Sequence, residues 1–186
     1  PRKERANGKI LKLLFVGSMS QRKGLADLFG AMKLIGSSSV SLSVLGQPSM
    51  PMSFYRSQYP SFEYLPTRSH EGVREAMLAH DVLVLPSIVE GRALVQQEAM
   101  ACGLPLIVTA NAGGEDLVEE EKTGFLVPIR QPERIAQKIE WFLENKGTLP
   151  DMSLHATQKA KKYRWSSYAR QIIDFCLRNE QTNNDN

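Results

Sequence analysis

The sequence predicts a single α/β domain with a doubly wound parallel sheet of six strands and helices on both faces. The first observation is an alternation of about six short apolar segments with amphipathic segments of helical period. This alternation is typical of a parallel sheet that is covered on both sides. The second is that 186 residues, 42% hydrophobic and 23% charged, suit one globular domain. We therefore expect a Rossmann-like domain over residues 10–180.

The first strand and the first helix have the clearest signals. Residues 10–16 are apolar except for Lys12 and end at Gly17, as expected for a buried strand. Residues 25–35 carry apolar side chains at helical spacing, and Gly36 suits the end of that helix. Residues 1–9 are polar and basic and are interpreted as a linker.

The same reasoning places the remaining elements in order. Further strands are expected at 40–45, 62–65, 81–85, 104–109 and 124–127. Further helices are expected at 72–79, 93–102, 132–145, 154–162 and 166–178, with Ser166 as a cap for the last one. Residues 181–186 are interpreted as a polar tail.

Composition narrows the class of protein. The net charge of +3 is too small to indicate nucleic acid as a partner. No uncharged apolar stretch reaches the roughly 20 residues of a membrane span, and the first residues lack the apolar core of a signal peptide. Cys102 and Cys176 are expected to be buried free thiols in a reducing compartment. We therefore expect a cytoplasmic globular protein.

A glycine-bounded turn with two cations follows the first predicted strand. It runs from Gly17 to Gly24 and places Arg22 and Lys23 directly before a helix. It matches neither the glycine fingerprint of dinucleotide-binding domains nor the P-loop, and no ribose-binding acid follows the second strand. Backbone N–H groups, a helix dipole and a lysine would suit a phosphate here. From this segment alone, a phosphate loop and a solvated basic loop both remain open.

Two glutamates flank the start of the predicted helix 93–102. Ligands of such sheets bind where the strand order reverses, which for the usual order lies between the first and fourth strands. Glu90 is expected in the loop after the fourth strand, and Glu98 in the second turn of the helix. The helix amino end then lies between two carboxylates, a layout suited to the diphosphate, ribose and hexose of a nucleotide sugar. Two surface glutamates beside a helix start are the open alternative.

Several ordered motifs extend the pattern over most of the chain. They are Phe15-Val16-Gly17 with Lys23-Gly24, then Pro86-Ser87-x-x-Glu90-Gly91, EAMACGLP at 98–105, Ala112-Gly113-Gly114-Glu115-Asp116, and TGFLVP at 123–128. Together they resemble the signature of retaining glycosyltransferases of family 4 (group 1), which have the two-domain GT-B fold. The resemblance implies that the chain is the carboxy-terminal, donor-binding domain of such an enzyme.

The resemblance also implies roles for individual residues. Glu98 would accept hydrogen bonds from the ribose hydroxyls of the donor, and Glu90 would face the transferred sugar. Lys23 would neutralise the leaving diphosphate, together with backbone N–H groups at Leu94 and Val95. Preorganised donors at a developing negative charge are usually the largest catalytic contribution, and a carboxylate favours an oxocarbenium-like sugar.

Further donor contacts follow from the same resemblance. They are expected from Gly17, Ser18, Arg22 and Gly91, and the base would be recognised through backbone around residues 65–68. The chain has no Asp-x-Asp pair, and its three histidines are scattered. We therefore expect no metal and no cofactor, with the nucleotide-diphospho-sugar as substrate.

The chain departs from the family pattern at a few positions. Ser18 stands where the family usually has Arg, and Ala93 replaces the second glycine of Glu-Gly-Phe-Gly. Arg92 takes the aromatic position, where it would contact a charged donor or acceptor or point to water. Asp116 replaces a later Glu. A catalytically inactive nucleotide-binding or interaction module and a sugar-nucleotide epimerase of related architecture are therefore kept as alternatives.

The resemblance implies partners beyond the donor. The acceptor would be held by an amino-terminal domain of the same parent chain, so the 186 residues alone are expected to be inactive. A lipid-linked acceptor or peripheral membrane association of the parent is a further expectation. The apolar face of the last helix, with Tyr168, Ile172, Phe175 and Cys176, would be partly exposed or covered by another copy of the chain.

Overall fold

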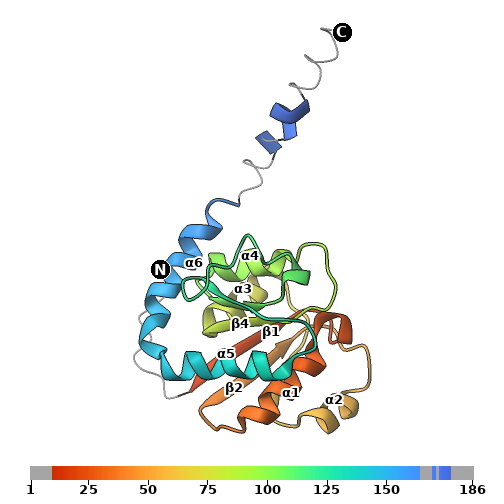
Figure 1. Ribbon diagram of the computed structural model, residues 1–186. Coiled ribbons are helices and arrows are strands. Elements are labelled where there is room, and N and C mark those ends of the chain that lie inside the picture. The colour runs from red at the N-terminus through yellow and green to blue at the C-terminus, as the bar shows by residue number, and fades with distance from the viewer. Residues whose placement is uncertain (1–9, 164–168, 171, 177–186) are drawn as a thin grey trace.

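The predicted six-stranded parallel sheet is present in the computed structural model, which describes residues 10–163, 169–170 and 172–176 (Figure 1). Its order is β3-β2-β1-β4-β5-β6, and all neighbouring strands are parallel. The strands are β1 (Leu11–Val16), β2 (Val40–Leu45), β3 (Phe62–Leu65), β4 (Val82–Leu85), β5 (Leu106–Val108) and β6 (Gly124–Leu126). This order confirms the doubly wound fold, with its switch point between β1 and β4.

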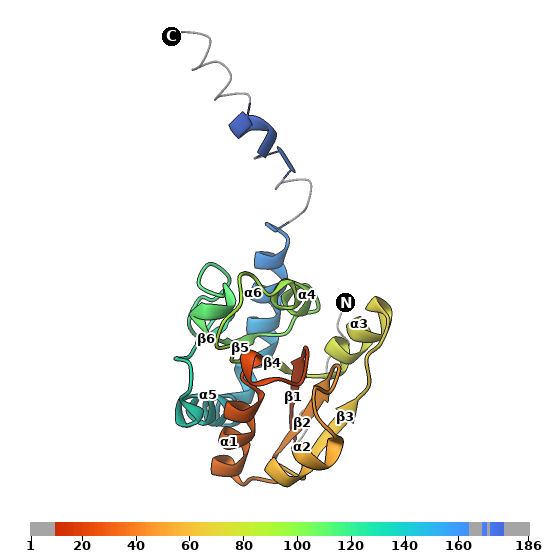
Figure 2. The same cartoon turned by 90° about the vertical axis from the view of Figure 1, so that its right-hand side faces the viewer.

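Helices cover both faces of the sheet. In Figures 1 and 2, α1, α2 and α5 lie on one side, and α3, α4 and α6 lie on the other. On these two sides α1 packs against α5, and α4 against α6. The helices are α1 (Leu25–Ile35), α2 (Met52–Gln58), α3 (His70–Ala79), α4 (Leu94–Ala101), α5 (Pro132–Glu144) and α6 (Leu149–Ala160), with short 3₁₀ turns η1 (Gln21–Lys23), η2 (Ala110–Ala112) and η3 (Lys146–Thr148).

Burial explains why the central strands form where they do. Every residue of β4 is fully buried, and β1 is buried except for Lys12. Strands covered on both faces need such continuous apolar runs. A glycine ends α1 as expected, since Gly36 adopts the left-handed conformation (φ 55°) directly after this helix.

Two helices differ from the expectation. The sequence analysis missed α2, in which Tyr55 is the only buried residue. The Tyr55 hydroxyl holds this short helix in place by donating to the carbonyl oxygen of Met19 at 2.6 Å. The helix expected at 154–162 begins earlier, at Leu149, with Pro150 in its first turn, where a missing N–H costs nothing.

The ends of the chain bear on the remaining expectations. The predicted linker 1–9, the tail 181–186, Ser166 and Tyr168 lie outside the described residues. Residues 169–170 and 172–176 are helical, and Ile172, Ile173 and Phe175 are exposed there. Neither Cys102 nor Cys176 is in a disulfide within the described part of the chain, as expected, but their expected burial is wrong, because Cys102 is half-buried and Cys176 exposed. Among the helices that the structure describes, none is long and apolar enough to cross a membrane.

Candidate functional site

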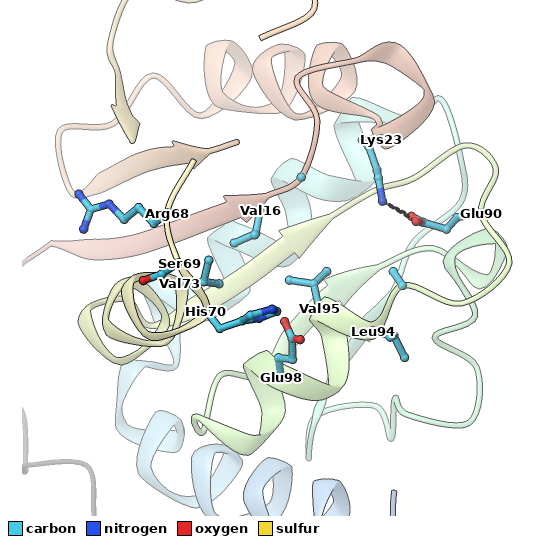
Figure 3. Close-up of a pocket in the computed structure, with 12 residues that line it drawn as sticks. Val16, Lys23, Arg68, Ser69, His70, Val73, Glu90, Leu94, Val95 and Glu98 are labelled. Atoms are coloured by element: carbon cyan, nitrogen blue, oxygen red, sulfur yellow. Dashed lines mark hydrogen bonds and ion pairs between the residues drawn. The ribbon is translucent and has the colours of Figure 1, made fainter. Parts of the chain in front are cut away.

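A pocket of about 350 Å³ opens at the carboxyl ends of β1 and β4, where the strand order reverses (Figure 3). Its walls come from the loop after β1, the loop after β4, the start of α3 and the first two turns of α4. The lining residues are Val16, Gly17, Lys23, Arg68, Ser69, His70, Val73, Glu90, Ala93, Leu94, Val95 and Glu98. The pocket therefore occupies the place where sheets of this topology bind ligands.

Lys23 reaches the pocket because two glycines let the loop after β1 fold tightly. Gly24, at the end of η1, has a φ of +73°, and a Cβ there would lie 1.9 Å from the carbonyl oxygen of Pro86. The turn can therefore pack directly against the end of β4. On its other side the Lys23 stem runs along Gly17, whose Cα lies at the end of β1 and whose φ of +150° also favours glycine.

Backbone hydrogen bonds fix the loop that carries Glu90. The N–H of Glu90 donates to the carbonyl of Asn111 at 3.0 Å, and the N–H of Ile88 donates to the carbonyl of Arg22 at 2.8 Å. The N–H of Ala93 donates to the carbonyl of Ala112 at 3.2 Å. The loop is thus held between η1 and η2, so Glu90 enters the pocket from a fixed backbone.

Lys23 and Glu90 are joined in an ion pair. Lys23 Nζ lies 2.5 Å from each carboxylate oxygen of Glu90, and only 11% and 17% of the two side chains is exposed (Figure 3). The Ser87 hydroxyl also donates to Glu90 Oε2, at 3.3 Å. Two residues that the sequence assigned to different parts of a donor are therefore in direct contact.

The amino end of α4 lies between the two carboxylates, as the sequence predicted. Leu94 and Val95 form its first turn, where helix N–H groups have no intrahelical acceptor. Glu98 lies in the second turn and lines the same pocket. The first turn of α4 thus offers N–H donors and a positive dipole end beside Lys23, which suits an anionic group.

The opposite wall of the pocket was only partly anticipated. It comes from Arg68, Ser69, His70 and Val73, at the start of α3. The sequence analysis had pointed to backbone around 65–68 but gave the histidines no role. In Figure 3 the His70 ring and the Glu98 carboxylate point toward each other. The available signal was topological, because the segment that follows β3 starts at the same edge of the sheet as the carboxyl ends of β1 and β4.

Three of the expected contact residues do not line the pocket. Ser18 is half-buried, and its hydroxyl lies 3.2 Å from that of Ser20. Gly91 is exposed. The Arg22 side chain is 52% exposed, with Nη1 3.4 Å from the carbonyl of Val89 and 3.9 Å from Glu90 Oε1. The structure therefore brings together Gly17, Lys23, Glu90, Leu94, Val95 and Glu98, and leaves these three outside.

Arg92 has a partner that the sequence analysis did not consider. Its Nη2 lies 2.7 Å from Asp116 Oδ2, and its guanidinium carbon lies 5.3 Å from the centre of the Tyr163 ring. The Tyr163 hydroxyl donates to the carbonyl of Asp116 at 2.9 Å, and burial followed by the charge of Asp116 raises the pKa of this phenol. The Arg92 side chain, which remains 42% exposed, is therefore held by Asp116 and Tyr163 beside the pocket.

The pocket combines two cations, Lys23 and Arg68, with two carboxylates and a helix amino end. Among the described residues, no group of three or more His, Cys, Asp or Glu side chains could hold a metal ion. The arrangement can bind an anion at Lys23 and α4, and hydroxyl groups at Glu90 and Glu98. Its chemistry suits a ligand that carries phosphates next to a polyol.

Comparison with known proteins identifies the family. The family model described as "Glycosyl transferases group 1" matches residues 1–163. A D-inositol 3-phosphate glycosyltransferase of Mycobacteroides abscessus is 34% identical over 110 residues, which is 59% of this chain and 24% of that protein. An uncharacterised glycosyltransferase of Methanocaldococcus jannaschii, MJ1607, is 25% identical over 169 residues, or 87% of this chain and 43% of that protein. The chain thus spans less than half the length of these curated relatives.

Solved structures share the fold. Sucrose-phosphate synthase from Thermosynechococcus elongatus has a TM-score of 0.79 and 24% identity, over 93% of this chain and 46% of that one. HepE from Anabaena, in complex with UDP and glucose, has a TM-score of 0.78 and 21% identity, over 91% and 48%. The C-terminal domain of a group 1 family protein, LpcC from Francisella tularensis, has a TM-score of 0.71 and 16% identity, over 82% and 85%.

These likenesses confirm the GT-B fold class expected from the sequence. With its family model matched over residues 1–163, the chain belongs to the group 1 glycosyl transferases.

Proposed function

We propose that this chain is the donor-binding domain of a retaining glycosyltransferase that uses a nucleoside-diphospho-sugar. The observation that carries the proposal is the pocket at the switch point, which puts Lys23, the amino end of α4, Glu90 and Glu98 around one cavity. The donor would lie across the pocket with its diphosphate at Lys23 and α4. Its ribose would then face Glu98, and its sugar would face Glu90.

The diphosphate end of the site accounts for leaving-group departure. Cleavage of the sugar–oxygen bond leaves both bonding electrons on the diphosphate oxygen. The ammonium of Lys23 and the N–H groups of Leu94 and Val95 stabilise the charge that develops there. This donor set does the work that a metal ion would otherwise do, so we propose transfer without a metal.

The sugar end of the site accounts for the fate of the reacting carbon. As the leaving group departs, the sugar gains oxocarbenium character, which a carboxylate on one face stabilises. In the proposed orientation of the donor, Glu90 would supply that carboxylate. We propose a hexose-type sugar and transfer with retention, in line with the resemblance found in the sequence.

Transfer needs an acceptor site that the proposal places elsewhere in the parent protein. The chain spans 24% and 43% of two curated relatives. An amino-terminal acceptor domain would supply the groups that bind the acceptor and close the cleft. We therefore expect these 186 residues to bind donor nucleotides weakly in a cytoplasmic protein and to transfer no sugar on their own.

Isothermal titration of UDP and GDP into the chain tests the proposal. Lys23→Ala and Glu98→Ala should each weaken the binding of the preferred nucleotide by about 10- to 100-fold, because each removes charge-assisted hydrogen bonds. Lys33→Ala and Glu133→Ala are matched controls, since both residues are exposed on outer helices.

The outcomes separate the parts of the proposal. Failure of both nucleotides to bind refutes donor binding by this chain. Binding that survives both Lys23→Ala and Glu98→Ala refutes the assigned roles while leaving a nucleotide-binding module. Sugar transfer by the 186 residues alone would overturn the expected dependence on a second domain.

A further inference from the structure

The Lys23–Glu90 ion pair conflicts with the separate roles that the proposed donor site gives to these two residues. Donor binding needs the ammonium of Lys23 at the diphosphate and the carboxylate of Glu90 at the sugar. Here Lys23 Nζ contacts both carboxylate oxygens of Glu90 at 2.5 Å. A diphosphate that enters the site must therefore compete with Glu90 for the ammonium of Lys23.

Burial explains why the two residues pair. Lys23 is 9% exposed, and a charge that is largely withdrawn from water needs an opposite charge beside it. Glu90 provides that charge from a side chain that is itself 17% exposed. Its two carboxylate oxygens therefore act, at Lys23, as the internal counterpart of phosphate oxygens.

Other groups can receive Glu90 once Lys23 leaves it. Arg22 Nη1 lies 3.9 Å from Glu90 Oε1, and its side chain is 52% exposed and anchored to the carbonyl of Val89. The Ser87 hydroxyl donates to the other oxygen, Oε2, at 3.3 Å. A small shift of the carboxylate toward Arg22 would therefore leave neither charge without a partner.

We propose that Glu90 is an internal competitor for the diphosphate and sets the affinity of the site for anions. The entering diphosphate displaces the carboxylate from Lys23, and Glu90 moves to Arg22 and the Ser87 hydroxyl. Diphosphate binding and the release of Glu90 from Lys23 are then a single event. This inference rests on the proposed donor-binding function and adds how that site is regulated.

The proposal predicts that removing the negative charge of Glu90 tightens nucleotide binding. Glu90→Gln keeps the size of the side chain and removes its charge. The dissociation constant for UDP should fall by about tenfold, since the competing charge-assisted contact is lost. Inorganic pyrophosphate, which lacks base and ribose, should show the same gain. Glu98→Gln, the matched control, removes the other carboxylate of the pocket and should give no gain.

A double-mutant cycle separates partner exchange from plain charge repulsion. If Glu90 acts through Lys23, the gain from Glu90→Gln should vanish in a Lys23→Ala background. Ligand-observed NMR can follow the weak binding of these variants. A gain that persists without Lys23 means that Glu90 merely repels phosphate, and it overturns the exchange. An unchanged or weaker affinity of Glu90→Gln also overturns it.

A measurement on the unaltered chain is independent of variant folding. With ¹³C-labelled glutamate, the carboxyl resonance of Glu90 should shift when UDP saturates the site. A resonance that does not move while UDP binds overturns the inference but leaves the proposed function intact. Failure of UDP to bind the unaltered chain and Glu90→Gln alike overturns both.

Discussion

Gly24 is the position where a single added methyl group should displace the loop after β1 from the rest of the pocket. Its φ of +73° is in the left-handed region, and a Cβ would lie 1.9 Å from the carbonyl oxygen of Pro86. Gly36 provides a matched control. It has a φ of +55°, but a Cβ there would meet only the carbonyl oxygen of Lys33, at 3.8 Å.

The two alanine variants should therefore differ by the cost of the close approach. Gly36→Ala carries only the left-handed penalty, about 1–2 kcal/mol. Gly24→Ala carries the same penalty and also needs a separation of at least 3.0 Å from Pro86. Displacements of this kind cost about 1–3 kcal/mol in packed regions. We expect a total loss of about 2–5 kcal/mol in the free energy of unfolding for Gly24→Ala.

Denaturant unfolding followed by circular dichroism measures both losses, and nucleotide titration measures the consequence for the site. The displaced turn carries Lys23, so Gly24→Ala should weaken UDP binding by about tenfold beyond Gly36→Ala. Equal destabilisation by the two variants would refute the role of the Pro86 contact. Full UDP affinity in a destabilised Gly24→Ala protein would refute the idea that this contact positions Lys23.

Two further predictions concern stability. Phe125 is fully buried and makes edge contacts with Trp141 and Phe142. Phe125→Ala should therefore lower the free energy of unfolding by about 3–5 kcal/mol. The control Phe54→Ala, at an exposed site of α2, should lower it by under about 1 kcal/mol. Burial raises the pKa of Asp27 above its usual 3.8, against the opposing charge of Arg130. The folded state therefore holds this proton more tightly than the unfolded state. Its stabilising contribution is present at low pH and is lost as pH rises through the raised pKa. Relative to Asp27→Asn, the unfolding free energy of the unaltered chain should fall over that interval, and parallel pH profiles would contradict this.

Elements with a complete local signal were predictable from the sequence. The strands at Val40–Leu45 and Phe62–Leu65 and the helix Leu25–Ile35 have the expected bounds. In the helix, the left-handed glycines Gly24 and Gly36 stand at its two ends. Apolar period and helix-ending glycines are both properties of neighbouring residues, which is why sequence alone could supply them.

Elements held by distant partners were not predictable in this way. Helix α2 has only seven residues, of which Tyr55 alone is buried, and Tyr55 fixes it through a hydrogen bond to Met19, 36 positions earlier. The same limit applies to the site. The motifs identified Lys23 and Glu90 separately, but their contact spans 67 positions and depends on how η1 packs against the end of β4.

Two departures from the family pattern, Arg92 and Asp116, are far apart in the sequence but contact each other in the fold. Taken alone, Arg92 in an aromatic position suggested contact with a charged ligand or with water, and Asp116 stood in place of a Glu. The structure joins them in an ion pair at 2.7 Å above the Tyr163 ring. Each departure therefore supplies the partner that the other needs. Since Gly91 and Arg92 follow Glu90 directly, this pair ties the Glu90 loop to the segment after η2 and to the end of α6. The unusual residues beside the pocket therefore help to fix the loop that carries Glu90.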